Sequence, residues 1–183
     1  PDGGMVTTYL DVTERKTQER ALQRERERLT NILKGTNAGS YEANLQTGSV
    51  EINDRWAELT GHSQAELEPL TLQTLPRLMH PDDIAPAQNA LVAHLKGETP
   101  YYRFEHRLKH KDGHWVWVAA HGQVATHTPD GRAEWMAGVY MDIAERKAAE
   151  LRVQELNETL EERVVERSAQ LNAAMQTLHQ SQE

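Results

Sequence analysis

Histidine is the residue type in this chain best suited to chemistry near neutral pH. The chain has nine histidines and no cysteine, and imidazole can exchange a proton or bind a transition metal in that pH range. None of the histidines lies in H-E-x-x-H or another strong metal-binding spacing. The sequence also contains no nucleophile elbow and no glycine-rich phosphate loop. We therefore predict no catalytic residue, no metal site and no enzymatic activity in this chain.

Most of the histidines have a structural interpretation. His80 is followed by Asp82 and Asp83, which predicts a helix start rather than a metal site. His110 and His114 flank a predicted hairpin, where we expect them to be exposed. His106 differs, because the alternation of its strand places it on an otherwise apolar face. A core histidine with satisfied hydrogen bonds is the more ordinary interpretation, and a ligand contact is the alternative.

Any ligand is expected between the longest helix of the domain and the strands that face it. Such sites combine a few polar groups with many apolar ones, so His106 would be the group that orients the ligand. The candidate lining residues are Tyr41, Trp56, Leu91, Leu95, Phe104, His106 and Trp117.

Composition excludes several classes of protein. The net charge of −8 argues against a nucleic-acid groove, and the absence of cysteine excludes disulfides and thiolate metal sites. No apolar run approaches the roughly 20 residues that span a bilayer. We therefore expect a cytoplasmic fragment with no membrane contact and no nucleic-acid partner. The low hydrophobic fraction of 38% predicts a modest core with long solvated helices attached.

The pattern of residues 35–143 predicts one complete α+β domain. Two short strands are followed by short helices, a long helix and three longer strands, an order typical of an antiparallel sheet with helices on one face. The strand at 114–125 is apolar on both faces, so we expect a central strand covered on both sides. The expected segments are strands at 39–43, 49–52, 101–110, 114–125 and 133–140 and a long helix at 83–96.

The junction after the last strand contains a helix-capping pattern. Asp142 and Glu145 are spaced as a capping residue and its partner three positions later. Nearly the same residues recur at 9–16, which suggests a second domain of the same kind upstream. We therefore expect residues 1–12 to be the last strand of a truncated upstream domain, 13–34 a linker helix, and 144–183 a C-terminal coiled-coil helix.

The two flanking helices carry apolar stripes. In the C-terminal helix the apolar positions step by three or four with one stutter, which favours a parallel dimeric coiled coil. The expected dimer residues are Val153, Leu156, Leu160, Val164, Leu171 and Leu178. Arg167 occupies a core position of this apolar stripe and should weaken the coiled coil. A weakened coiled coil can adopt two packings of similar energy, as a switch needs; the alternative is a tolerated imperfection. The N-terminal stripe fits either a coiled coil or a solvated helix.

Several motifs, taken in order, resemble a PAS domain of the bacterial sensory type. They are Asn53-Asp54-Arg55-Trp56, Leu59-Thr60-Gly61-His62-Ser63, His80-Pro81-Asp82-Asp83, Glu105-His106-Arg107-Leu108, Lys111-Asp112-Gly113-His114-Trp115-Val116-Trp117-Val118 and the segment 138–147. The resemblance covers about residues 33–147. It implies a five-stranded antiparallel sheet whose helical face can enclose a ligand. It also implies that signals leave through a junction at Asp142, Ile143, Glu145 and Arg146.

The resemblance leaves the cofactor unknown but restricts the choice. Without cysteine, a cysteinyl flavin or a thioester-linked chromophore is excluded. Haem would need a histidine on the long helix, where His94 is available, and a non-covalent flavin would need flanking rings such as Trp56 and Trp117. Residues 156–182 are similar to linkers that precede histidine-kinase dimerisation domains. We predict a homodimeric sensor and relay module with an output domain in the same chain. The alternatives are a ligand-free dimerisation spacer and a haem or flavin redox sensor.

Overall fold

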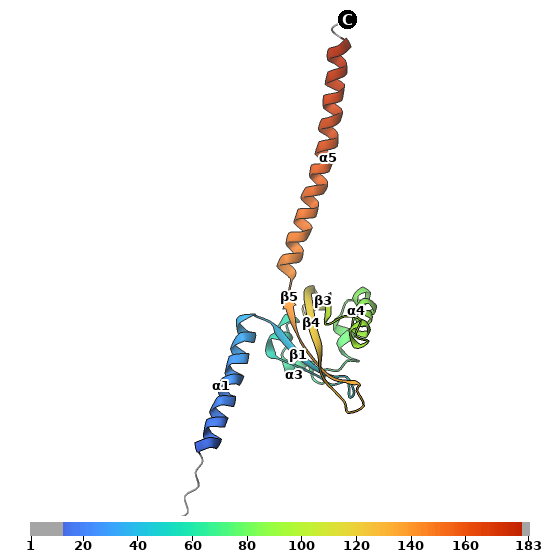
Figure 1. Cartoon of the computed structure of the whole chain (residues 1–183). Helices are drawn as coiled ribbons and strands as arrows, with labels where there is room; N and C mark the ends of the chain where they lie inside the picture. Colours follow the sequence, from blue (N-terminus) through green and yellow to red (C-terminus); the bar gives the residue numbers. More distant parts are fainter. Residues whose placement is uncertain (1–12, 181–183) are drawn as a thin grey trace, which may run out of the picture.

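The structure of the chain is a computed structural model that describes residues 13–180, with side chains described for residues 16–171. The strand predicted within residues 1–12 lies outside the described residues, as does the side chain of Leu178. Within the described part, the α+β prediction is confirmed, with one long helix on each side of a small sheet domain (Figure 1).

The sheet has five strands in the order β2-β1-β5-β4-β3, and every neighbouring pair is antiparallel. The last strand is therefore central, and β3 forms one edge of the sheet. The strands are β1 (Gly39–Asn44), β2 (Val50–Ile52), β3 (Tyr102–Lys109), β4 (Trp115–His127) and β5 (Ala133–Asp142).

The short helices fill the connection between β2 and β3, and they begin at defined caps. Asn53 caps α2 because its Oδ1 accepts a hydrogen bond from Trp56 N at 2.9 Å. His80 caps α4, and Pro81 occupies the first helical position, where its missing N–H costs nothing. The long helix thus begins two residues before the predicted Asp83. The elements are α2 (Asp54–Leu59), α3 (Gln64–Leu67), η1 (Leu75–Leu78) and α4 (Pro81–Leu95).

The core lies between the inner face of the sheet and these helices. Leu108, Val118 and Ala120 from the strands are fully buried, as is Trp56 from α2. Burying a large apolar side chain of this kind stabilises the fold by about 1.5–3 kcal/mol. The alternation of β3 and β4 thus places one side of each strand in the core.

Two glycines in adjacent strands make room for a tyrosine ring on the inner face. A Cβ at Gly122 would lie 2.2 Å from Tyr41 Oη, and one at Gly138 would lie 2.7 Å from Tyr41 Cε1. Gly122 and Gly138 are paired in register, and Gly138 also pairs with Tyr41. Only residues without a side chain leave this space, so the glycine pair determines where the Tyr41 ring lies.

The expectation that β4 is central and covered on both sides requires correction. β4 is paired on both edges, but β5 is the central strand. On the outer face, Trp115 stays 39% exposed, and Trp117 is covered only in part. Its cover consists of the charged side chains Arg107 and Lys147, whose Cζ and Nζ lie 5.2 and 5.1 Å from its ring centroid.

The flanking helices, α1 (Thr13–Gly35) and α5 (Ala144–Gln180), extend away from the domain (Figure 1). Most of their described apolar side chains are exposed in the single chain: Leu22 and Leu29 are more than half exposed, and so are Val153 and Leu156. Among the described residues, no helix is long and apolar enough to cross a membrane.

Candidate functional site

A small cavity lies between the inner face of the sheet and the helices, where the sequence predicts a ligand. Its volume is about 60 Å³, far below the roughly 300–1,000 Å³ of typical small-molecule sites. It is lined by Tyr41, Ala43, Leu45, Val50, Leu72, Leu75, Leu91, Tyr102, Met136 and Tyr140. Tyr41 and Leu91 are thus the two predicted residues that line it.

Three tyrosines supply the polar groups of the cavity. Burial raises the pKa of Tyr102 to about 12, and it raises the pKa values of Tyr41 and Tyr140 still further. All three phenols are therefore neutral at physiological pH and able to donate a hydrogen bond. The Tyr41 hydroxyl is buried and has no hydrogen-bond partner among the described residues.

Tyr140 connects this cavity to the rest of the aromatic core. Its ring meets those of Tyr41, Trp56 and His106 edge to face, with centroids 5.3, 5.5 and 5.4 Å apart. Trp56 and His106 therefore lie behind Tyr140, and they do not line the cavity directly.

His106 is fully buried, and neither ring nitrogen has a hydrogen-bond partner among the described residues. The described residues therefore do not supply the hydrogen bonds that a satisfied core histidine needs, and the partner of the His106 ring stays open between water and a ligand. Burial lowers the pKa of His106 to about 4, although the Asp83 carboxylate and the nearby Phe104 backbone act in the opposite direction. A neutral imidazole offers one donor and one acceptor, and leaving such groups unpaired costs about 1–3 kcal/mol.

Three of the other predicted lining residues lie elsewhere. Phe104 is half-buried and stacks beside His106, with centroids 5.9 Å apart. Leu95 is 42% exposed, so the prediction that it lines the cavity is wrong. Trp117 lies on the outer face of the sheet, and the prediction for this residue is wrong too. The orientation of α4 explains why Leu95 is exposed, because the helix buries Asp83, Ala87 and His94 instead.

The structure does not support the residues proposed for either cofactor, His94 for haem and the pair of tryptophan rings for a flavin. His94 Nδ1 donates a hydrogen bond to Thr99 O at 3.0 Å, and its Nε2 accepts one from Val124 N at 3.2 Å. Both ring nitrogens of His94 are thus occupied, and neither is free to bind haem iron. Trp56 and Trp117 lie on opposite faces of the sheet, so they cannot flank one flavin ring.

The junction between β5 and α5 combines a helix cap with a backbone hydrogen bond that extends the pairing of β5 with β4. Asp142 Oδ1 accepts a hydrogen bond from Ala144 N at 2.8 Å, as the capping pattern predicts. Ile143 is buried, and its N–H donates to Trp117 O at 3.0 Å. Glu145 makes no side-chain hydrogen bond or ion pair within the described part of the chain, so the predicted reciprocal half of the capping box is absent there.

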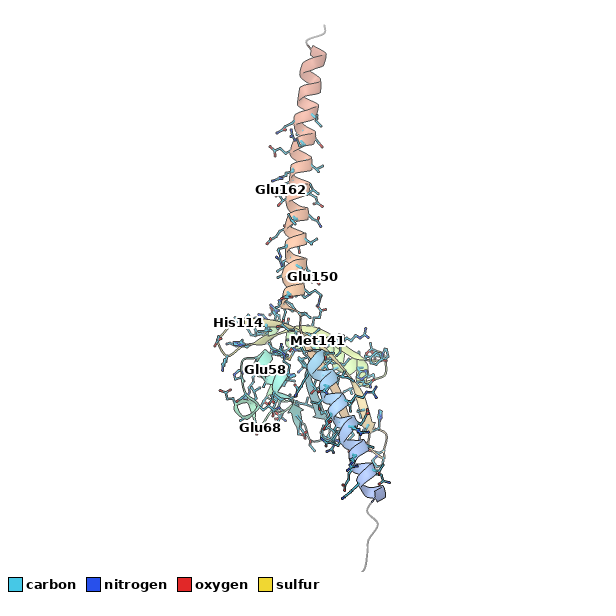
Figure 2. The ribbon with its side chains drawn as sticks, turned by 90° about the vertical axis from the view of Figure 1, so that its left-hand side faces the viewer. Glu58, Glu68, His114, Met141, Glu150 and Glu162 are labelled. Atoms are coloured by element: carbon cyan, nitrogen blue, oxygen red, sulfur yellow. The ribbon has the colours of Figure 1, made fainter. Side chains whose placement is uncertain are left out.

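A charged cluster fixes the first turn of α5 to the outer face of β3. Glu105 accepts from Arg146 Nη2 at 2.7 Å and from Lys147 Nζ at 2.9 Å. Both cations also pair with Glu150, which lies where α5 leaves the domain (Figure 2). The Lys147 ammonium, and then Arg146, hold the pKa of Glu105 below its usual value. Sequence reasoning included Arg146 in the junction but missed Lys147 and Glu105.

A second set of contacts connects the first turn of α4 to Lys147 in the first turn of α5. Asp83 accepts from Arg107 N and Nε, each at 2.9 Å, and from Arg107 Nη2 at 2.7 Å. The Arg107 guanidinium holds the pKa of Asp83 below its usual value. Arg107 and Lys147 both lie over the Trp117 ring. We call Asp83, Arg107, Trp117 and Lys147 the α4–α5 contact chain.

Comparison with known proteins gives a consistent family. The family model described as PAS fold matches residues 49–140, half of the chain. A sensory box histidine kinase/response regulator from Burkholderia thailandensis E264 is similar in structure, with a TM-score of 0.63 and 28% identity over 73% of this chain and 97% of that one. The N-terminal domain of a diguanylate cyclase with PAS/PAC sensor from Marinobacter aquaeolei has a TM-score of 0.53 and 25% identity, over 60% and 98%.

A domain of a putative light and redox sensing histidine kinase from Haloarcula marismortui shares the fold, with a TM-score of 0.51 and 23% identity over 64% of this chain and 99% of that one. A search of curated protein sequences found no match.

Proposed function

We propose that this chain, which belongs to the PAS fold family, is a non-catalytic sensor and relay module of a larger signalling protein. A histidine kinase is the parent that we favour. The Burkholderia neighbour bears that name and covers more of this chain than the cyclase neighbour does. Residues 156–182 also resemble linkers that precede histidine-kinase dimerisation domains. In this proposal the output domain follows in the same chain.

The proposed input is a small polar molecule that binds beside Tyr140. The observation that carries it is the unpartnered imidazole of His106, together with the unpartnered hydroxyl of Tyr41. Native proteins pair more than about nine in ten of their buried polar groups, so each exception calls for an explanation. A ligand that both accepts and donates hydrogen bonds would satisfy these groups. Because His106 lies behind Tyr140 and the cavity is only about 60 Å³, such a ligand requires both the Tyr140 ring and the helical layer to move.

The proposed relay runs through β3, because one face of this strand contacts the proposed ligand site and the other contacts the start of α5. Phe104 and His106 face the core, whereas Glu105 and Arg107 face the outer surface and its charged groups. A shift of β3 or α4 that pairs His106 with a ligand would therefore disturb the α4–α5 contact chain. The ion pairs of Glu105 with Arg146 and Lys147 are partly exposed, so each contributes modestly, as a reversible switch requires.

The proposed output is a change in the packing of a parallel homodimer along α5. Support comes from its apolar stripe, in which Val153, Leu156, Leu160, Val164 and Leu171 are 57–68% exposed in the single chain. A cytoplasmic location remains part of this proposal. To test the dimer, light scattering should compare the whole chain with a form that ends at Lys147. We expect the whole chain to be a dimer and the shortened form to be mostly monomeric. A shortened form that stays dimeric would place the interface elsewhere.

The ligand is tested by screening small polar molecules for stabilisation of the chain against heat. A true ligand raises the melting temperature of the wild type by mass action. It also shifts the ¹⁵N resonances of the His106 ring, and it has no effect on His106→Leu. The matched control is His127→Leu, which changes an exposed histidine at the far end of β4. A compound that stabilises all three proteins equally would not be binding at His106.

A ligand-free dimerisation spacer is the second candidate function. The small volume of the cavity favours it, because about 60 Å³ leaves little room for a ligand. This alternative predicts that no compound moves the His106 resonances. It also predicts that ordered water pairs with the His106 nitrogens, which nuclear Overhauser contacts between the ring protons and a long-lived bound water would reveal.

A further inference from the structure

The hairpin between β3 and β4 carries three metal-binding side chains outside the cavity and the junction. They are His110, Asp112 and His114, at alternate positions of the sequence. One ligand atom from each lies within 4.8 Å of the others. We propose that these three residues form a binding site for a late first-row divalent cation such as Zn²⁺.

The backbone of the hairpin holds the three residues together. His110 N donates to His114 O at 2.9 Å, and Gly113 N donates to His110 O at 2.8 Å. Gly113 has a φ of 93°, which a residue with a side chain adopts only with strain. In addition, Lys111 N donates to Thr60 O at 2.9 Å and ties the turn to the end of α2. The turn is therefore fixed before any ion binds.

The His110 ring is positioned so that Nδ1 is the nitrogen that faces Asp112, and a metal there would replace the long 3.2 Å hydrogen bond from Asp112 N. Its Nε2 edge packs against Gly61, where a Cβ would lie only 2.2 Å away. Its Nδ1 lies 3.3 Å from Asp112 Oδ2. That separation is about the edge of a tetrahedron whose arms are 2.0–2.1 Å, the usual zinc–ligand distances.

A cation also resolves a conflict in the hydrogen bonding of His110. Asp112 N donates to Nδ1 at 3.2 Å, which requires a lone pair on that nitrogen. The Asp112 carboxylate then faces the same lone pair, so two acceptors lie 3.3 Å apart. A divalent ion coordinated by Nδ1 and Oδ2 would take the Nδ1 lone pair in place of the Asp112 N–H, and it would convert this repulsion into attraction.

His114 supplies the third ligand, and its position leaves coordination sites open. Its ring stacks on that of His110, with centroids 4.3 Å apart and an interplanar angle of 24°. His114 lies at the outer margin of the domain (Figure 2). His114 and Asp112 are exposed, so rotation of their side chains can shorten the remaining distances. Two imidazoles and one carboxylate are typical of zinc sites that keep water in a fourth position, and imidazole also suits Ni²⁺ and Cu²⁺.

The test is isothermal titration of the whole chain with Zn²⁺, repeated with Co²⁺ so that the absorbance of the bound ion reports its ligands. We expect one ion per chain. His110→Ala and His114→Ala should each weaken binding at least about tenfold, since a change even in the outer shell of a metal site costs 10–100-fold. Asp112→Asn should weaken it while keeping the turn, because asparagine also suits turns. His127→Ala, which removes an exposed histidine elsewhere, should bind as the wild type does.

Two results would overturn the assignment. One is a wild-type chain that binds no Zn²⁺ while remaining folded by circular dichroism. The other is a His110→Ala/His114→Ala double variant that binds Zn²⁺ with unchanged affinity and stoichiometry. Zn²⁺ should also raise the melting temperature of the wild type but not of the double variant, which separates loss of the site from loss of the fold.

Discussion

Replacing His106 with leucine should make the domain more stable, and more so in acid. Leucine has a similar volume and no polar atom, so the substitution removes two buried nitrogens that have no partner among the described residues. Relief of that unpaired polarity contributes about 1–3 kcal/mol at any pH. The expected direction is unusual, because most core substitutions destabilise a protein.

The acid-dependent part follows from the lowered pKa of His106. Burial brings this pKa to about 4, against about 6.5 in the unfolded chain. The unfolded state therefore binds more protons between these values, and wild-type stability falls as the pH drops from about 6.5 towards 4. At pH 5 the loss through this group is about 2 kcal/mol, and it reaches about 3.4 kcal/mol at full protonation. His106→Leu removes this loss.

Urea unfolding at pH 8 and pH 5 measures both parts. The wild type should lose stability between these pH values, and His106→Leu should lose about 2 kcal/mol less. His106→Gln also removes the titration but keeps a buried polar group, so it separates the two contributions. His127→Leu is the control for an exposed histidine. If His106→Leu and the wild type lose the same stability at pH 5, then His106 is not buried in a neutral form and the argument fails.

Three further predictions concern residues around this site. Asp83→Ala should destabilise the fold by about 2–3 kcal/mol, because it removes three hydrogen bonds from Arg107. Because the pKa of Asp83 is lowered in the folded state, its carboxylate stabilises the fold above about pH 4, and this stabilisation is lost in stronger acid. Acid unfolding of the wild type and of Asp83→Asn should show this difference. Gly122→Ala should cost about 1–3 kcal/mol in urea unfolding, because the new Cβ meets the Tyr41 hydroxyl; an unchanged midpoint would contradict this. Asp142→Ala should cost about 0.5–2 kcal/mol and Asp142→Asn less, measured by the melting temperature; equal effects would show that the side chain is not a cap.

Local patterns predicted the elements of this fold well, because their signals are local. The helix start near His80, the hairpin between His110 and His114 and the alternation of β3 all follow from neighbouring residues. The identification of the family from ordered motifs is confirmed by the match to residues 49–140.

The composition of the site was harder to predict, because it depends on contacts between distant segments. Leu95 and His94 are adjacent, so the orientation of α4 about its axis decides which is buried; His94 shares the buried face with Asp83 and Ala87. Trp117 and Val118 are both apolar, so only the strand pairing shows which faces the core. The glycine pair that admits Tyr41 likewise lies on two strands far from it in sequence. The signal for His94 was present, since it continues the spacing of Ala87 and Leu91.

The central claim is that the core beside His106 is coupled to the start of α5 through the α4–α5 contact chain. The most direct test is a double-mutant cycle, with the whole chain fused to a histidine-kinase output and autophosphorylation as the readout. The cycle combines His106→Leu with Trp117→Leu, and circular dichroism verifies that each variant is folded. We expect His106→Leu to change kinase activity severalfold when Trp117 is present and to have little effect when Trp117 is leucine. An equal change in both backgrounds, or none in either, would contradict the relay.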